Sequence, residues 1–596
     1  MKSFVKTTLA VMCGIFVMNI IGVIFFLLFI GSASSALSLN STPVLPREGV
    51  LKMDMSKIAL VEQPVAGVDI QSAFSGGSRV VPVGMWNAVQ AIKFAAADPS
   101  VKFIYLKPDG VSADLANVEE LRTALAGFRK SGKAVISYIE QPTTASYYLA
   151  SVADKVYMSA NTGATPMITG VGAQMFFLKD LLDKLGVNVQ LIRHGKYKSA
   201  GEMYVRNSPS ADNLEQNREM VASIWNTVAS DVADSRELTP EALSAMVDGL
   251  VLNKSADMLE NSLVDGLLTK DELREQIAVQ ALKEDFSDVS MISFSDYASV
   301  YGNGNLSSKK RIAVVYANGN IVEGEGYDNV PGDTFARILA ALRKDDSVKA
   351  VVLRVASPGG SVLAADKIRS EIDLLRADKP VIASYGNYAA SGGYWISNSC
   401  DFIFTDRVTL TGSIGCFSMI PDFSKTASDV LHVGVTTVGS SKHSSMYSLT
   451  RPLDSDEVAY MQRSIEDIYD RFVANVAEGR ALDAEYVDSV AQGRVWTGAD
   501  ALSLKLVDSI GTLDDAVRYA AECAGDPDLS QWTVDSYPRP MSWFETIMAA
   551  VGQGFNPDGD VLAGTPFSSL TSAFKDWSWE KADHNYARMP YEIILK

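Results

Sequence analysis

Hydrophobic positions form one long run near the N-terminus. From Thr8 to Ile30 the chain carries no charge and is dominated by Leu, Val, Ile, Phe and Met. About 20 apolar residues suffice for a membrane-spanning helix, whereas the apolar part of a cleaved secretory signal has about 7 to 15. The pattern predicts a transmembrane signal anchor over residues 1–36, with cleavage within the small residues 32–36 as the minority alternative.

Charges beside this run predict its orientation. Lys2 and Lys6 precede the run, and basic residues favour the cytoplasmic side of a membrane. We therefore expect the body after residue 36 to lie on the extracytoplasmic side. In an oxidising compartment Cys400 and Cys416 could pair, although lone cysteines in an apolar chain are more often buried thiols.

The body of the chain repeats one pattern of hydrophobic and polar positions. Residues 100–106 (SVKFIYL) match residues 347–353 (SVKAVVL) at an offset of 247. In the segment that follows each match, apolar residues recur at the spacing of an amphipathic helix. The offset drifts to 243 where Leu263 matches Leu506, as expected if small deletions separate the copies.

Each copy alternates short apolar runs with amphipathic stretches, which predicts an α/β fold built from tandem βαβ domains. Right-handed crossovers then give a mostly parallel sheet, with chemistry at the carboxyl ends of its strands. A polar segment over residues 302–310 is the best linker between the copies. The predicted divisions are an anchor at 1–36, repeats at 37–302 and 303–536, and an extension of unknown role at 537–596.

Composition narrows the classes of function. The chain has 71 acidic and 53 basic residues, a net charge of −18, which disfavours binding to a nucleic-acid backbone. Its four cysteines and four histidines form no CxxC or HExxH pattern, so no metal site is predicted. No cofactor is indicated.

Two glycine-rich turns in the second copy carry the candidate chemistry. A strand ending near Val355 runs into Ser-Pro-Gly-Gly-Ser, and the next strand leads to Ser391, which is followed by two glycines. Glycine allows amide N–H groups at such turns to face an oxyanion, beside a serine nucleophile. The candidate oxyanion hole comprises Gly359, Gly360 and Gly392. The alternative is that Ser391 caps a helix and that the glycines only permit close packing.

The first copy has lost these turn glycines and carries Thr144 at the position equivalent to Ser391. A serine nucleophile also needs a base, and the motif GxSxG is absent. Lys198, in a basic segment of the first copy, is one candidate, although the segment could also be a solvated basic turn. A lysine base must be desolvated or lie near cations, and nearby positive groups would help to lower the pKa of Lys198. Lys442 and His443 are equal rivals on composition alone.

Longer motifs carry a family resemblance. The chain closely resembles signal peptide peptidase A of the long, internally duplicated type, a family of membrane-anchored bacterial serine proteases with a crotonase-like or Clp-protease-like fold. The resemblance extends from the anchor to about residue 535. Its motifs are YKSA (197–200), YYLAS (147–151), LRVASPGGSV (353–362), AASGGYWIS (389–397), LTGSIG (410–415) and VWTGADA (495–501).

This resemblance implies a Ser/Lys dyad divided between the copies. Ser391 matches the family's nucleophile, Lys198 its general base, and Ser413 the hydroxyl that hydrogen-bonds the lysine. The glycines at 359, 360 and 392 match its oxyanion hole. The chain departs from the family at residues 201–203, where Gly-Glu-Met replaces Val-Glu-Pro.

The family also implies a homotetramer at the bacterial cytoplasmic (inner) membrane, with a single-pass anchor and a periplasmic catalytic body. Its substrates are apolar signal peptides, cleaved through an acyl-enzyme intermediate. Two alternatives come from other classes of protein. A crotonase-like acyl-thioester enzyme would need a coenzyme A site, and an inactive membrane scaffold would keep the fold and lose the dyad.

Overall fold

The computed structural model describes residues 43–63, 80–304, 307–326 and 329–539, together with Met18 and the strand Asn585–Arg588. The predicted anchor lies outside these ranges, apart from Met18, and so does most of the extension after residue 537. Within the described ranges, no helix has the length and hydrophobicity needed to cross a membrane. The chain from Pro46 onward forms one compact unit, which carries the elements described below.

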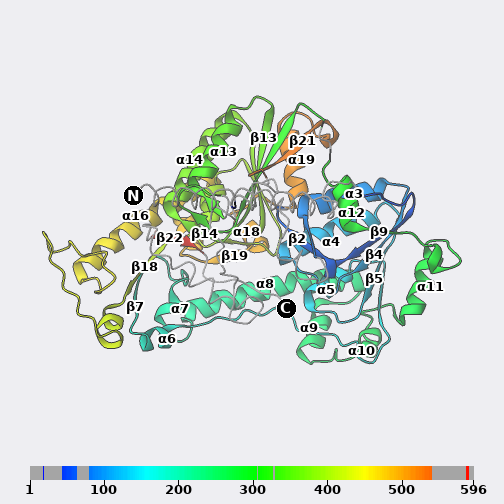
Figure 1. Cartoon of the computed structure of the whole chain (residues 1–596), viewed down its shortest axis with the longest axis horizontal. Helices are drawn as coiled ribbons and strands as arrows, with labels where there is room; N and C mark the ends of the chain where they lie inside the picture. Colours follow the sequence, from blue (N-terminus) through cyan, green and yellow to red (C-terminus); the bar gives the residue numbers. More distant parts are fainter. Residues whose placement is uncertain are drawn as a thin grey trace, which may run out of the picture. The chain divides into compact units, whose positions relative to one another are not determined.

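A six-stranded parallel sheet organises the first repeat (Figure 1). Its strand order is β8-β6-β5-β4-β1-β9, and each neighbouring pair runs parallel. Nearly every residue of its central strands is buried, as expected for a parallel sheet covered on both faces. The strands are β1 (Gly49–Asp54), β4 (Val101–Lys107), β5 (Val135–Ile139), β6 (Lys155–Ser159), β8 (Gly266–Leu268) and β9 (Met291–Ser293).

The second repeat builds a sheet with the same order. Its strands β20-β16-β15-β13-β10-β21 are also parallel throughout and correspond one by one to those of the first repeat. The prediction of an α/β fold with mostly parallel sheets is thus confirmed. The strands are β10 (Arg311–Asn318), β13 (Val348–Ser357), β15 (Val381–Ala390), β16 (Phe402–Thr405), β20 (Ser509–Ile510) and β21 (Thr533–Tyr537).

The second repeat extends this plan at the end of β15. There β17 (Leu410–Gly412) pairs with β15, and β19 (Val495–Thr497) pairs with β17. Helices α13 (Gly332–Lys344) and α14 (Val362–Asp378) cover one face of the sheet, and α19 (Leu513–Cys523) covers the other (Figure 1). Ser361 is the N-cap of α14, and its side chain accepts a hydrogen bond from the amide of Ala364.

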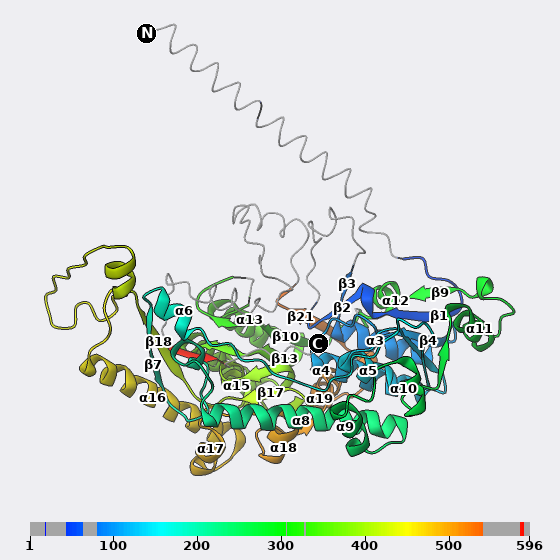
Figure 2. The same cartoon turned by 90° about the horizontal axis from the view of Figure 1, so that it is seen from below.

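One long helix of the first repeat reaches the second. Helix α8 (Ala211–Arg236) extends over about 39 Å at 1.5 Å per residue. It contacts α5 (Thr144–Ala150) and α9 (Pro240–Asp248) of the first repeat and β19 of the second. Figure 2 shows α8 next to α9. Segments just before α8 can therefore be held against the second repeat.

A third sheet contains strands of both repeats. In it β7 (Asn188–Arg193) of the first repeat pairs antiparallel with β18 (Phe417–Asp422) of the second over six residues. Its full order is β12-β11-β14-β22-β18-β7. The remaining strands are β11 (Ile321–Val322), β12 (Val330–Pro331), β14 (Gly359–Ser361) and β22 (Asn585–Arg588). Backbone pairing across the repeats thus places the segment after β7 beside the second sheet.

Buried ion pairs also join the repeats. Arg354 of β13 is fully buried and lies 2.7 Å from carboxylate oxygens of both Glu62 and Glu120 of the first repeat. Burial, with the negative charges of Glu120 and Glu119, raises the pKa of Asp406 well above its usual range. This shift favours the protonated form of the Asp406 carboxyl, which limits the negative charge that Arg354 must balance.

Candidate active site

Ser391 lies between β15 and the short helix α15 (Gly392–Ser397), and it is fully buried. Its backbone has φ 55° and ψ −112°, a conformation that is costly for a residue other than glycine. It occupies the N-cap position, yet its side chain makes no capping hydrogen bond. The capping alternative therefore does not explain this serine, and a strained, non-capping serine is typical of a functional site.

The equivalent turn of the first repeat is ordinary. Helix α5 is capped by Thr143, whose side chain and backbone exchange hydrogen bonds with Ser146. Thr144, which the offset of 247 aligns with Ser391, lies one residue inside the helix and accepts a hydrogen bond from the amide of Thr169. The first repeat thus has a helix at the equivalent position, but the hydroxyl groups described there cap the helix or hydrogen-bond the backbone.

Lys198 follows β7 and reaches the serine of the other repeat within the same chain. Its Nζ lies 2.7 Å from Ser391 Oγ, 2.9 Å from Ser413 Oγ and 3.0 Å from the Ser413 carbonyl oxygen. All three residues are fully buried. The structure therefore brings together three residues that sequence analysis singled out from separate motifs.

The three contacts of Lys198 match the two hydrogen-bond donors and one acceptor of a neutral amine. A neutral amine has two N–H groups and one lone pair, whereas an ammonium group has three N–H groups and no acceptor. The neutral form can donate to both oxygens of Ser413 and accept the hydroxyl proton of Ser391. Ser413 thereby leaves the lone pair of Lys198 directed at Ser391 Oγ.

Burial lowers the pKa of Lys198 to about 7, and the nearby Cys416 thiol opposes this shift. Of the two causes that the sequence left open, desolvation lowers this pKa, and the expected help from cationic neighbours is not found. Arg193 instead donates to the Lys198 carbonyl oxygen, and Lys196 is exposed over the ring of Tyr197. Removal of the amine from water is the cause that remains.

This burial predicts a pH-dependent cost to folding. Because the pKa of Lys198 is about 7 when folded and about 10.4 when unfolded, the unfolded chain binds more protons between these values. Stability should rise with pH through that window, by roughly 4 to 5 kcal/mol. Lys198→Met removes the cost, so its stability advantage should be largest near pH 6 and shrink toward pH 10.

Denaturant unfolding of the parent protein and of Lys198→Met at pH 6, 8 and 10 measures the stability difference between them. Lys442→Met is the matched control, because Lys442 is exposed and pairs with Asp456. It should show no such trend. A stability difference between Lys198→Met and the parent that stays constant with pH would contradict the burial argument.

Contacts from both repeats fix the backbone around Lys198. The Gln216 side chain on α8 donates to the Tyr197 carbonyl oxygen and the Ser199 hydroxyl, and its oxygen accepts from the Val495 amide. A Cβ at Gly493 would lie 2.6 Å from the Lys198 backbone nitrogen, so only glycine fits. Sequence analysis missed Gln216 and Gly493. Neither lies in a local motif for a base, and only the tertiary structure indicates their role.

The predicted oxyanion glycines lie at two adjoining turns. Gly360 has φ 157°, and a Cβ there would lie 1.9 Å from the Ile321 carbonyl oxygen, so a side chain is excluded. A Cβ at Gly393 would lie 2.6 Å from the Ser357 carbonyl oxygen, which shows how closely the two turns approach. The amide of Gly359 donates to Ser357 Oγ, and Gly392 is the first residue of α15.

The rival bases are engaged elsewhere. Lys442 pairs with Asp456, and His443 Nδ1 lies 3.0 Å from Glu457 Oε1. Among the described residues, His443, Asp454 and Glu457 are also the one group that could hold a metal ion. Arg451 already donates to both carboxylate oxygens of Glu457, and this cation competes with any metal there.

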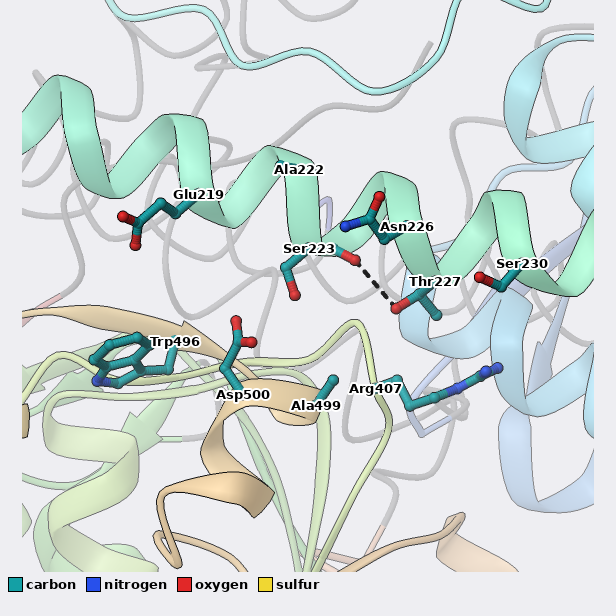
Figure 3. Close-up of a pocket in the computed structure, with 10 residues that line it drawn as sticks. All are labelled: Glu219, Ala222, Ser223, Asn226, Thr227, Ser230, Arg407, Trp496, Ala499 and Asp500. Atoms are coloured by element: carbon teal, nitrogen blue, oxygen red, sulfur yellow. Dashed lines mark hydrogen bonds between the residues drawn. The ribbon is translucent and has the colours of Figure 1, made fainter. Parts of the chain in front are cut away.

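Two further features of the described residues are a pair of buried cysteines and a cavity. Cys400 and Cys416 are buried thiols without a disulfide, and burial raises the pKa of each to about 12. A cavity of about 520 Å³ lies between α8 and α18 (Gly498–Ser503), where Figure 3 shows Asp500 opposite Ser223. Its lining includes none of the residues around Ser391 described above.

Known proteins are similar to this chain over most of its length. A sequence profile of "Peptidase family S49" matches residues 127–283 and 373–525. "Protease 4" of Haemophilus influenzae is 34% identical over 522 residues, which cover 85% of this chain and 84% of that protein. "Serine protease SPPA, chloroplastic" of Arabidopsis thaliana is 30% identical, over 77% of this chain and 68% of that protein.

Two other similarities cover less of the chain. "Putative signal peptide peptidase SppA" of Enterococcus faecium is 32% identical, over 40% of this chain and 70% of that protein. A solved structure, "1510-N membrane-bound stomatin-specific protease S97A mutant", covers 38% of this chain and 98% of its own at 15% identity and a TM-score of 0.26, which does not establish a common fold. The matches along most of the chain do establish the family: this protein belongs to peptidase family S49, as a serine protease of the long, internally duplicated SppA type.

Proposed function

We propose that the protein is a membrane-anchored endopeptidase that degrades cleaved signal peptides with a Ser391/Lys198 dyad. The observation that carries the proposal is the 2.7 Å contact between a fully buried lysine amine and a fully buried serine hydroxyl. A pKa of about 7 leaves much of the amine neutral at physiological pH. A neutral amine at this distance is a competent general base for the serine.

The proposed reaction proceeds through an acyl-enzyme. Ser391 Oγ attacks the substrate carbonyl carbon as its proton passes to Lys198 Nζ, and the carbonyl oxygen becomes an oxyanion. Amides at the Gly359–Gly360 and Gly392 turns stabilise that oxyanion. The Lys198 ammonium then protonates the leaving amine as the C–N bond breaks. A water molecule, deprotonated by Lys198, then attacks the ester carbonyl carbon. The ester C–O bond breaks, and Lys198 returns the proton to Ser391 Oγ.

Ser413 holds the base in place throughout. Its hydroxyl and carbonyl oxygens accept from Lys198 in both protonation states, so the amine need not move as it gains and loses a proton. Burial makes a second contribution, because it lowers the pKa of the amine so that Lys198 can accept and return a proton near neutral pH. The site thus needs neither a histidine nor a metal ion for the proposed steps.

The proposed substrate, location and assembly are supported by the family resemblance and by the predicted anchor. The name of the Enterococcus faecium relative supports signal peptides as substrates. The apolar run over residues 8–30 supports a single-pass anchor in the cytoplasmic membrane, with the body on the periplasmic side. We further propose that each repeat has the crotonase-like or Clp-protease-like fold and that four chains associate, as the family resemblance implies. The two matching parallel sheets support the first of these proposals.

Substrate preference provides the test. We expect the full-length protein in detergent to hydrolyse an apolar signal-peptide-like peptide at least about tenfold more efficiently than a charged peptide of equal length, measured as kcat/KM, because apolar side chains gain most from leaving water. Ser391→Ala should cleave neither peptide. Equal efficiency on the two peptides would contradict the proposed substrate class, while cleavage by the Ser391→Ala protein would contradict the mechanism.

A further inference from the structure

Arg494 lies between the segment of the candidate base and the cavity beside α8. Its Cζ atom lies 4.8 Å from the ring centroid of Tyr197 and 4.2 Å from that of Trp496, so the guanidinium contacts both rings. Tyr197 immediately precedes Lys198, and Trp496 lines the cavity of about 520 Å³. The guanidinium thus occupies the space between the base segment and the cavity wall.

The end of the cavity next to Arg494 is polar and reached by solvent. Glu219 of α8 and Trp496 of β19 lie on opposite walls of this end, as Figure 3 shows. The Glu219 side chain is 57% exposed and pairs with Arg494, whose own side chain is only 15% exposed. Water therefore reaches the cavity side of the guanidinium, while Lys198 beyond Tyr197 is fully buried.

Hydrogen bonds hold Arg494 by its backbone and by its side chain. The amide of Ser413 donates to the Arg494 carbonyl oxygen at 2.6 Å. Arg494 Nη1 donates to the Tyr197 hydroxyl at 3.2 Å, and that hydroxyl donates to Glu215 on α8. One residue is thereby bonded both to Ser413, which holds the Lys198 amine, and to Tyr197, which precedes it.

Charged neighbours have little effect on the Lys198 amine. Burial is the largest influence on its pKa, and the accompanying charge effect comes from Cys416, whose own pKa of about 12 leaves the thiol neutral. The titratable groups on the surrounding elements include Arg193 on β7, Glu215 and Glu219 on α8, and Asp470 on α16 (Ser455–Arg480). The two nearby guanidinium groups each pair with a carboxylate: Arg193 with Glu202 and Arg494 with Glu219. Exclusion of water is therefore the effect that Arg494 can have on the amine.

We propose that Arg494 is a positioning residue that closes the base segment against the cavity and keeps water away from Lys198. It acts through Tyr197 and Ser413, not on the reacting atoms. The proposal rests on the proposed function in one respect, namely that Lys198 is the base. If water enters from the cavity, the ammonium form of the amine gains solvation and the neutral form becomes rarer near neutral pH.

Arg494→Ala opens this path and tests the proposal. The midpoint of the pH profile of kcat/KM for a short apolar peptide should rise by at least about one pH unit, because water stabilises the ammonium form. The variant should therefore be about tenfold less active than the parent at pH 6 and within about twofold of it at pH 10. A merely structural defect would lower the rate at both pH values.

Arg494→Met separates the entry of water from the loss of charge. Methionine fills the place between the two rings with apolar volume, so the midpoint should stay within about 0.3 pH unit of the parent value. Arg337→Ala, which removes an exposed arginine that pairs with Glu325, is the matched control and should leave the midpoint unchanged. If Arg494→Ala does not fold, Trp496→Ala removes the ring on the cavity side and takes its place with the same expectation.

Two results would overturn the proposal. The first is a midpoint in Arg494→Ala that stays at the parent value. The second is an equal rise in Arg494→Met and Arg494→Ala, since the lost charge, and not water, would then be the cause.

Stability measurements separate this proposal from the proposed function. The stability difference between Lys198→Met and its parent should change about a third less between pH 6 and pH 10 when both proteins also carry Arg494→Ala, because the folded pKa lies closer to the unfolded one. This readout needs no activity. An unchanged pH dependence contradicts the closure whatever the activity, while a reduced one in a protein whose parent hydrolyses no peptide contradicts the proposed function alone.

Discussion

Ser391→Ala and Lys198→Met should each lower kcat/KM for an apolar peptide by a factor of at least about 10³ while the protein stays folded. The first substitution removes the attacking oxygen. The second replaces the amine with an apolar group of similar length, so that Ser391 loses the group that accepts its proton. Peptide hydrolysis measured at pH 8 gives the loss directly, and circular dichroism gives the folded state.

A variant with both substitutions gives a more specific test of the dyad. Catalytic groups that act as a unit are strongly non-additive, so Ser391→Ala with Lys198→Met should be scarcely worse than either substitution alone. Thr144→Ala and Lys442→Met are the matched controls at the equivalent turn and at a rival base, and both should keep most activity. Retention of more than a tenth of the activity by Lys198→Met would contradict its assignment as the base.

Arg354→Met should lower the free energy of unfolding by about 3 to 5 kcal/mol, the range for breaking a buried ion pair. The guanidinium donates to Glu62, to Ser384 Oγ and to the Tyr385 carbonyl oxygen, and it pairs with Glu120. Its removal leaves two buried carboxyl groups of the first repeat without their cation. Denaturant unfolding measures the loss.

An exposed ion pair provides the comparison for Arg354. Arg337 lies 3.6 Å from Glu325 with both side chains mostly exposed, so Arg337→Met should change the free energy of unfolding by less than about 1 kcal/mol. Adding Glu62→Gln and Glu120→Gln to Arg354→Met should recover part of the loss, because amides cost less to bury than carboxylates. Equal losses for Arg354→Met and Arg337→Met would show that the buried cluster does not join the repeats energetically.

Much of the fold was predictable because the chain contains two versions of it. Matching runs such as residues 100–106 and 347–353 indicated equivalent strands, and the structure pairs each of them within its own parallel sheet. The contacts between the repeats were not predictable in the same way. An internal repeat shows which residues are equivalent, and equivalence carries no information about which residues touch.

The candidate site shows the same division. The two turns with Gly359 and Ser391 were visible because glycine pairs at consecutive strand ends are a local pattern. Lys198 could not be separated from Lys442 and His443 by composition, since its place depends on the pairing of β7 with β18. The choice between desolvation and nearby cations as the cause of its lowered pKa also stayed open, because burial is a property of the folded chain. Strand β22 is only four residues long and has no counterpart among the described residues of the first repeat, so no pattern indicated its position.

The central claim is that Lys198 of the first repeat activates Ser391 of the second. The rate at which a fluorophosphonate labels Ser391 between pH 5 and pH 9, in the parent protein and in Lys198→Met, tests it most directly. The account predicts that the parent rate rises with pH through a midpoint near 7, the pKa that burial gives the amine. Lys198→Met should label at least about a hundredfold more slowly and without that midpoint. Labelling of Lys198→Met at the parent rate, with the same midpoint, would contradict the account.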